Sequence, residues 1–380
     1  MSPAPGAEAK GGFLKRHRRA LLAVLGVAAV IGFVHFALPE IVGLGPTLRR
    51  LEGGNAWWLA LGVFVETLSI AGEVVFLRGV FSRPRSRIGW RASYEITLAG
   101  AAATKLFATA GAGGVTLTVW ALRSAGLGAD QVATGMVSYE ILNYAVYMAA
   151  LAIVGLGLWL GVFSGHAPLG VTLIPAAFGA GVIALVLSIG AIEPPVERAL
   201  ARRTDRSSGR LHRWWQRAAT ASRTLRSGLS AALEMVRRRD PALLGVLAAW
   251  GFDIAALWAS FRAFGHSPPG GVLVMGYYVG TLANTLPLPG GIGGVEGGMI
   301  GAFLVFGVSG SLAVLAVLAY RTISYWLPTL PGAVAYVRLR RTVAGWRSQA
   351  PRGERRLPRS LPGSQPPTVN SGDANKGSPT

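Results

Sequence analysis

Charged side chains set within apolar sequence are the residues of this chain best suited to bind or react. A charge at the centre of a bilayer costs roughly 2.5–3.5 kcal/mol on insertion scales, so it usually faces a cavity or a partner. The chain has no Cys and its five His are scattered, which gives no basis for predicting a metal site. We therefore expect binding rather than enzymatic activity, with no catalytic residue, metal or cofactor. The charged candidates are Glu66, Glu73, Lys105, Glu140, Asp253, Glu296 and Arg321.

Two glycine clusters interrupt the apolar sequence, one at 111–114 and one, with two prolines, at 287–294. A helix broken inside a bilayer presents free backbone N–H groups and a positive end, which suit an anionic headgroup. Glycine lets that headgroup approach the backbone closely, although tight helix packing also explains glycines in membranes. Glu296 would bind a cationic group or a proton, or cap the following helix. The predicted substrate-binding residues are Lys105, Gly113, Gly114, Asn284, Pro289, Gly290, Gly291, Gly293, Gly294 and Glu296.

The composition requires that helices in a membrane position these residues. Of the 380 residues, 51% are hydrophobic and 14% are charged, and the mean hydropathy is +0.44. Soluble domains carry about a quarter charged residues, so the composition excludes a soluble enzyme, a disordered chain and a fibrous repeat. A spanning helix needs about 20 apolar residues. Apolar segments lie at 20–38, 56–80, 94–110, 115–122, 132–162, 171–192, 241–264, 272–288, 295–306 and 311–337.

The placement of arginine predicts the orientation of these segments. Basic residues gather at 15–19, 83–87, 193–240 and 338–359, and the positive-inside rule then puts both termini in the cytoplasm. We expect the plasma membrane. Between the basic loop at 83–87 and the loop at 163–170 the chain must cross an odd number of times. Either all three intervening segments cross, or the two short ones form a re-entrant hairpin, which their length favours.

The predicted fold is an all-α polytopic membrane protein with about eight transmembrane helices. We expect two inverted repeats, 20–162 and 163–337, each with a re-entrant broken-helix hairpin, as in many secondary transporters. A basic cytoplasmic N-terminus at 1–19 precedes them, and a basic, then disordered, cytoplasmic tail at 338–380 follows. Two unrelated breaks in a glycine-rich chain are the alternative. The matching positions are Gly113-Gly114-Val115 with Gly293-Gly294-Val295, Gly126 with Gly307, and Tyr139-Glu140 with Tyr320-Arg321.

The last of these matches suggests an ion pair. Glu140 and Arg321 carry opposite charges at corresponding positions of the two repeats. We therefore predict that they pair near the centre of the molecule. A buried pair of this kind often serves the fold alone, so a structural role for Arg321 stands beside lipid contact.

The basic segment at 193–240 carries apolar residues at helical spacing, including Leu211, Trp214, Trp215, Leu225 and Leu229. Such a pattern is typical of a helix lying on a membrane surface, with Trp at the headgroup level. We predict that residues 198–239 contact the anionic inner leaflet. A basic run also suits nucleic acid, but no recognition motif accompanies this one, so the expected partners are membrane lipids and not nucleic acid.

The second glycine cluster resembles a known family. The string from Asn284 to Glu296, Asn-Thr-Leu-Pro-Leu-Pro-Gly-Gly-Ile-Gly-Gly-Val-Glu, followed by Gly307 and Tyr320-Arg321, is similar to the flippase-like membrane domain of lysylphosphatidylglycerol synthases. The resemblance covers roughly residues 21–341. It implies the lipid-moving half of those proteins, because the chain has no room for their soluble synthase domain. The family's first re-entrant copy usually carries an Asn and a Pro, where this chain has Thr104 and Thr109.

Together these observations predict a lipid flippase or transporter. Its substrate would be an anionic or aminoacylated phospholipid, or a polyprenyl-phosphate lipid, passing through a cavity between the re-entrant hairpins. No nucleotide-binding string is present, so a gradient or the lipid's own concentration difference would supply any energy. A membrane-embedded lipid-linked transferase and a non-transporting scaffold of a lipid-modifying complex are the alternatives. Paired acidic metal ligands, which such transferases typically need, are not evident.

Overall fold

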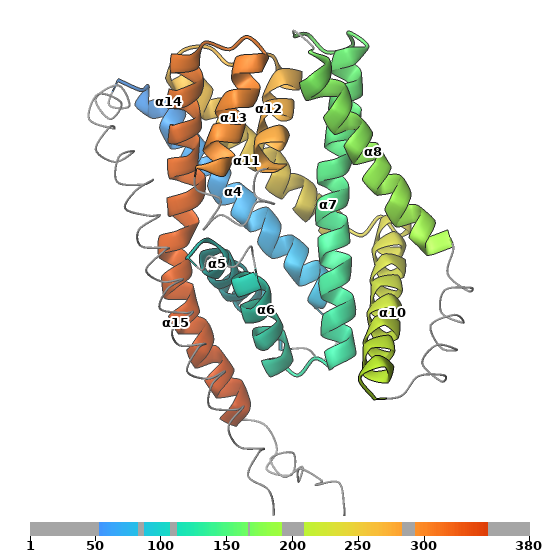
Figure 1. Cartoon of the computed structure of the whole chain (residues 1–380). Helices are drawn as coiled ribbons and strands as arrows, with labels where there is room; N and C mark the ends of the chain where they lie inside the picture. Colours follow the sequence, from blue (N-terminus) through green and yellow to red (C-terminus); the bar gives the residue numbers. More distant parts are fainter. Residues whose placement is uncertain are drawn as a thin grey trace, which may run out of the picture.

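The computed structural model describes residues 53–82, 87–106, 112–165, 168–191, 209–282 and 293–348, and all regular structure within them is helical (Figure 1). The helices that are long and apolar enough to cross a membrane lie at Ala56–Phe81, Ala129–Trp159, Leu169–Ser188, Ala242–Ala263 and Gly310–Trp346. The chain is therefore an all-α, multi-pass membrane protein, as its composition predicts. The expected first span at 20–38 and the tail beyond 348 lie outside the described residues.

Two helices from opposite halves of the chain form the most extensive helix–helix contact among the described residues. They are α4 (Ala56–Phe81) and α11 (Ala242–Ala263). A Cβ atom added to Gly72 of α4 would lie 2.7 Å from the backbone N of Ala249 and 2.7 Å from the carbonyl O of Gly245. Ser69 also donates from its Oγ to the Ala249 carbonyl over 2.8 Å. Small residues thus let the two backbones touch, as is usual for packed membrane helices.

Two pairs of short helices fill opposite ends of the molecule. The first pair is α5 (Trp90–Leu106) and α6 (Ala112–Ser124), and the second is α12 (Gly270–Leu282) and α13 (Gly294–Val305). Figure 1 shows α5 and α6 in the lower half and α12 and α13 in the upper half. The two helices of each pair pack closely. A Cβ atom added to Gly114 of α6 would lie 2.6 Å from the carbonyl O of Gly100 on α5. A Cβ atom added to Gly280 of α12 would lie 2.7 Å from the backbone N of Met299 on α13.

A long helix follows each short pair after the same kind of turn. The first is α7 (Ala129–Trp159); the second starts as α14 (Gly310–Arg321) and continues through a π-helical turn, Thr322–Trp326, into α15 (Leu327–Ser348). Gly126 (φ +97°) and Gly307 (φ +84°) precede them. The next residue donates back to the helix end in both turns, Leu127 N to Leu122 O over 3.3 Å and Val308 N to Phe303 O over 2.9 Å. The left-handed conformation that this turn requires favours glycine.

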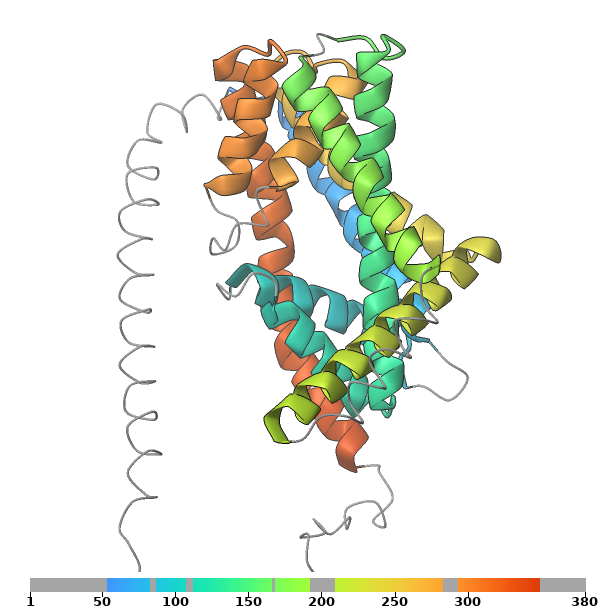
Figure 2. The same ribbon diagram turned by 45° about the vertical axis from the view of Figure 1, so that its right-hand side comes forward.

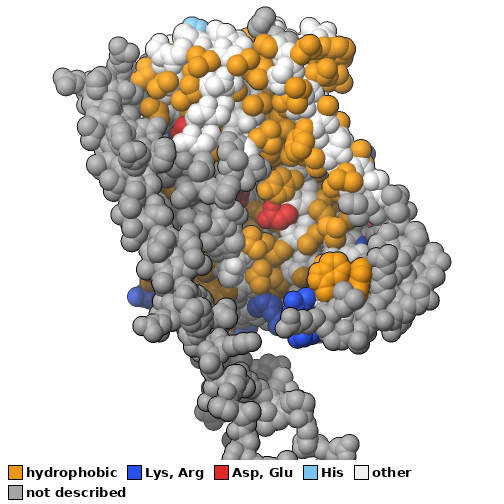
Figure 3. All heavy atoms as spheres, in the orientation of Figure 1, with side chains coloured by type: hydrophobic (Ala, Val, Ile, Leu, Met, Phe, Trp, Pro, Cys, Tyr) orange, Lys and Arg blue, Asp and Glu red, His pale blue; other side chains and the backbone are white. Residues whose placement is uncertain are grey.

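Helices α8 (Leu169–Ala191) and α10 (Gly209–Arg237) pack against α7 from outside. Figure 2 shows α10 crossing α7 obliquely. The predicted amphipathic helix is therefore present, but its described part begins at Gly209. Leu229 and Ala232 of its apolar stripe are buried, whereas Trp214, Leu225 and Leu233 are exposed. Figure 3 shows hydrophobic side chains over most of one face and Lys and Arg side chains gathered towards its lower end.

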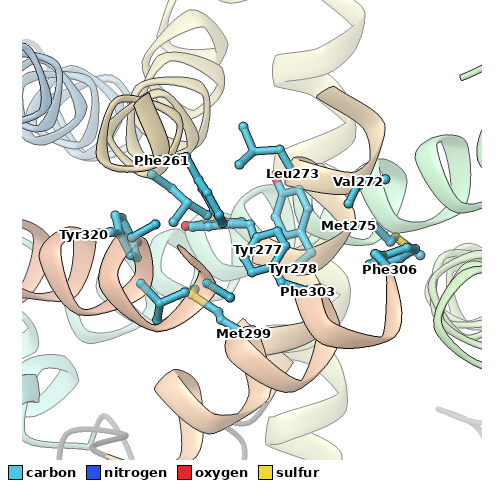
Figure 4. Close-up of a cluster of buried hydrophobic side chains, with 14 of the residues drawn as sticks. Phe261, Val272, Leu273, Met275, Tyr277, Tyr278, Met299, Phe303, Phe306 and Tyr320 are labelled. Carbon is cyan, nitrogen blue, oxygen red and sulfur yellow. The ribbon is translucent and has the colours of Figure 1, made fainter. Parts of the chain in front are cut away.

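Buried side chains form two main clusters. One joins α11, α12, α13 and α14 and includes Phe261, Met275, Tyr278 and Phe303. Figure 4 shows these side chains converging, with Tyr277 extending from α12 towards Tyr320 of α14. The other joins α4, α5, α6 and α15. Members of both clusters line the cavity described next.

Candidate functional site: a charged cavity in the bundle

A cavity of about 400 Å³ lies where the two short helix pairs approach the long helices. Helices α4, α5, α7, α11, α12, α13 and α14 and the π-helical turn all contribute to its lining. The cavity brings together most of the predicted intramembrane charges, and Glu296 contacts one of them from outside the lining. The charged residues of the lining are Glu66, Glu73, Lys105, Asp253 and Arg321.

Arg321 forms its ion pair with Glu296. The Arg321 Nε lies 2.7 Å from Glu296 Oε1, and both side chains are 14% exposed. The second carboxylate oxygen of Glu296 accepts from the backbone N of Gly293 over 2.8 Å, which caps the start of α13. Glu296 thus combines the predicted capping role with a contact to Arg321. The Arg321 Nη2 is buried without a hydrogen-bond partner among the described residues.

The predicted Glu140–Arg321 pair is wrong. Glu140 instead lines a separate, largely apolar pocket with residues of α6, α7, α8 and α10. On α7 the residue that faces the charged cavity is Asn143, whose Oδ1 accepts from Trp250 Nε1 over 2.9 Å. The backbone differs at the two positions, since α7 continues as a regular helix through Glu140, whereas Arg321 directly precedes the π-helical turn.

Two tyrosines hold Asp253 in place. Tyr320 donates from its hydroxyl to Asp253 Oδ1 over 2.8 Å, and Tyr277 donates to Asp253 Oδ2. Glu66 lines the same cavity as Asp253. Glu66 is only 5% exposed, and its Oε2 has no hydrogen-bond partner among the described residues. Such orphaned buried atoms indicate a place for a ligand or water, because a polar group buried without a partner is costly.

Lys105 connects the end of α5 to the π-helical turn. Its Nζ donates to the Ser324 carbonyl over 2.6 Å, and the Tyr325 hydroxyl donates to the Lys105 carbonyl over 2.9 Å. A π-helical turn interrupts the regular backbone ladder and is frequent at functional sites. Nothing in the sequence of Thr322–Trp326 distinguishes this turn from a regular helix, so the sequence does not predict it. The sequence singles out Asp253 as an intramembrane charge but not its tyrosine partners, for which the tyrosines of neighbouring spans are the signal.

Only part of the predicted glycine site is described. Gly114 is buried against Gly100 and therefore serves the packing of α5 on α6. Gly113 lies beside it in the first turn of α6. Gly293 takes a left-handed conformation (φ +81°) at the start of α13, which begins at Gly294. Thr104 lines the cavity. Asn284, Pro289, Gly290, Gly291 and Thr109 lie outside the described residues.

Acidic residues outnumber basic ones in the lining of the cavity. Glu296 neutralises Arg321, and the remaining titratable carboxyl groups of the lining are those of Glu66, Glu73 and Asp253, beside the amine of Lys105. Lys105 donates to a backbone carbonyl. In the low dielectric of a bundle interior, a carboxyl group that ionises here attracts a cation strongly.

The contact between Tyr325 and Lys105 has a measurable expected effect. Tyr325→Phe removes the hydroxyl that donates to the Lys105 carbonyl, and we expect a loss of about 1 kcal/mol of stability. Thermal unfolding of the purified protein in detergent measures it. Tyr336→Phe, at an exposed position of α15, should stay within about 0.5 kcal/mol of the wild type. Equal stability of both variants would show that the π-helical turn is not held by this bond.

Comparison with known proteins agrees with this architecture. A curated UPF0104 membrane protein of Methanothermobacter thermautotrophicus is 25% identical over 336 residues, covering 84% of this chain and 95% of the relative. Two further matches to UPF0104 membrane proteins of that organism are local. They are 39% and 37% identical over 92 and 89 residues, which is about a quarter of each relative's length. The family described as the lysylphosphatidylglycerol synthase transmembrane region matches residues 21–332, and this chain belongs to that family.

Proposed function

We propose that this chain moves phospholipids between the two leaflets, with the headgroup passing through the charged cavity. The observation that carries the proposal is the cavity itself, which gathers three carboxylates, Lys105 and Arg321 inside an apolar helical bundle. Insertion of so many charges is expensive, and a polar headgroup crossing the membrane is a reason for their presence. The family relationship supports a role in lipid metabolism.

The topology that we propose consists of two inverted repeats with re-entrant hairpins. At 1.5 Å per residue, α12 and α13 span only about 20 Å, and α5 and α6 about 20–26 Å, which is less than the roughly 30 Å of a hydrocarbon core. The matched turns at Gly126 and Gly307 support a repeat. The Lys and Arg side chains at the lower end (Figure 3) favour a cytoplasmic position for that end and for α10 at the inner leaflet. The basic residues at 15–19 and 338–359 of the sequence favour the same side for both termini.

The excess of carboxylates favours an aminoacylated phospholipid over a plain anionic phospholipid or a polyprenyl phosphate. An ammonium group would lie against Glu66 and Asp253, where one oxygen lacks a partner. The phosphate of the same lipid would lie towards Lys105 and the unpartnered Nη2 of Arg321. A headgroup that carries both charges satisfies both ends of the cavity, because a buried charge needs a partner.

Liposomes containing the purified protein test the proposal. They would carry trace fluorescent lysylphosphatidylglycerol, phosphatidylglycerol or a polyprenyl phosphate, and a membrane-impermeant quencher would report the protected inner leaflet. We expect the aminoacylated lipid to become accessible fastest. Asp253→Asn should slow it about tenfold or more, since a hydrogen bond to a charged group contributes about 1.5–3 kcal/mol.

Glu234→Gln is the matched control, because this half-exposed carboxylate of α10 lies outside the cavity. It should leave the rate unchanged. If the inner-leaflet pool of every lipid stayed protected from the quencher, with and without a proton gradient, the proposal would be contradicted and a transferase or a scaffold would be favoured. If Asp253→Asn and Glu234→Gln slowed the lipid equally, lipid movement would not depend on this cavity.

A further inference from the structure

Two carboxyl groups in the lining of the cavity have no ion-pair partner among the described residues, which the movement of a headgroup does not by itself explain. They are Glu66 of α4 and Asp253 of α11, and we call them the Glu66–Asp253 pair. The hydroxyls of Tyr277 and Tyr320 donate to both oxygens of Asp253. No donor among the described residues reaches the buried Oε2 of Glu66. An isolated charge is costly to bury, so Glu66 holds a proton while the cavity contains no other cation to pair with it.

No basic side chain of the described residues forms an ion pair with Glu66 or Asp253 that would take the place of this proton. The charged and titratable groups that face the pair are Glu73 from α4, Lys105 from α5, Tyr277 from α12, and Tyr320 and Arg321 from α14. Arg321 is paired with Glu296. Lys105 donates to the Ser324 carbonyl on the π-helical turn. No ion pair to Glu66 or Asp253 is formed within the described part of the chain, so a cation entering the cavity meets both carboxyls.

The cavity also contains buried polar atoms that lack a partner. Glu66, which lines the cavity, is 5% exposed, and its Oε2 has no hydrogen-bond partner among the described residues. The Oγ of Ser324, another residue of the lining, is also buried and lacks one. A primary ammonium has three donors. In the cavity it would donate to the carboxylate of Glu66, once Glu66 has lost its proton.

We propose that a proton and the ammonium group of the lipid occupy the Glu66–Asp253 pair in turn, so that the protein exchanges one for the other. When the ammonium binds, the O–H bond of Glu66 breaks and its proton leaves through water in the cavity to the side from which the lipid entered. When the ammonium leaves on the other side, Glu66 takes a proton from that side. Each cycle then moves one positive charge in each direction. This inference rests on the proposed function and adds its energy source.

Binding in detergent tests the exchange without transport. Calorimetric titration of the protein with short-chain lysylphosphatidylglycerol, in two buffers of different ionisation enthalpy, counts the protons released. We expect about one proton per lipid bound at a pH where the pair keeps its proton. Phosphatidylglycerol with the same chains, which lacks the amine, should release none. Glu66→Gln keeps the size of the side chain but has no acidic proton, so it should also release none.

A pH gradient across proteoliposomes tests the exchange during transport. With the lumen one pH unit more alkaline than the medium, inward protons would drive the lysyl lipid outward. One-for-one exchange shifts its leaflet ratio by up to about tenfold at steady state, since one pH unit equals about 1.4 kcal/mol. The result does not depend on the orientation of the protein. An ionophore that collapses the gradient should abolish the shift, and Glu234→Gln should retain it.

The outcomes separate the two proposals. Lipid movement with an unchanged leaflet ratio and no proton release would overturn the exchange and leave the proposed function standing. Proton release on binding without lipid movement would overturn the proposed function, and exchange across the membrane with it, and would leave only the competition of a proton and an ammonium for Glu66. If the lysyl lipid does not bind at all, both fail. A leaflet shift that persists in Glu66→Gln would also overturn the assignment, because that side chain cannot carry the proton.

Discussion

Replacing Arg321 with alanine is expected to be the most damaging change of a single charge in this protein. Glu296 would remain largely buried, 14% exposed, with its partner removed. Breaking a buried pair on one side costs about 3–5 kcal/mol, because it leaves an uncompensated charge. We expect a large drop in the thermal unfolding temperature in detergent, together with loss of lipid movement. Glu296 also caps α13, so the loss of stability would extend to the second pair of short helices.

The chain offers a matched control for this prediction. Arg238 and Glu234 of the α10 end form another Arg–Glu pair, with side chains 77% and 50% exposed. Exposed pairs contribute about 0–1 kcal/mol, so Arg238→Ala should leave stability nearly unchanged. The double variant Arg321→Ala with Glu296→Ala should lose less than the sum of the single variants, because neither charge is then left alone. A strictly additive loss would argue against the pair.

Adding one methyl group at Gly72 is the second change with a large expected effect. The added Cβ would lie 2.7 Å from two backbone atoms of α11, and backbone cannot move aside as a flexible side chain does. Overpacking of this kind costs about 1–3 kcal/mol and sometimes more. Gly72→Ala should therefore lower the unfolding temperature and the yield of monodisperse protein on size exclusion.

Gly251→Ala is the control, on α11, the helix that packs against Gly72. Gly251 is an exposed residue of α11, and no atom lies within 4 Å of its added Cβ. In a helix interior Ala is better than Gly by up to about 1 kcal/mol, so this variant should be neutral or stabilising. The two substitutions are chemically identical and should have opposite signs. If Gly72→Ala were also stabilising, the backbone contact between α4 and α11 would be refuted.

The sequence predicts where the long helices of this fold lie, but not which of their side chains contact one another. The apolar run at 56–80 becomes α4 at Ala56–Phe81, because only a continuous helix satisfies the backbone in lipid. Most of the charged residues within the apolar segments, among them Glu66 and Arg321, likewise line the cavity. Which charge meets which depends on the rotation of each helix about its axis. The Glu140–Arg321 prediction therefore failed, although the two residues stand at matching positions.

The π-helical turn is a further feature that single-sequence patterns do not reveal. Contacts from a helix more than two hundred residues away surround it, with Lys105 donating to the Ser324 carbonyl and accepting from Tyr325. Similarly, Asp253 looks like an isolated charge in sequence, and its tyrosines come from two other helices. Conversely, the matched glycines Gly126 and Gly307 were identified by sequence, because a left-handed turn places a local demand on residue type.

The contact between α4 and α11 also has a consequence for how the protein is made. Ser69 and its partner Ala249 are separated by 180 residues. At about 5–20 residues per second, a ribosome needs roughly ten to forty seconds to supply α11 after α4 has entered the membrane. During that interval the face of α4 that carries Gly72 lacks its native partner. The first half of the chain, synthesised alone, should therefore be degraded or aggregate, and co-synthesis with the second half as a separate chain should rescue it.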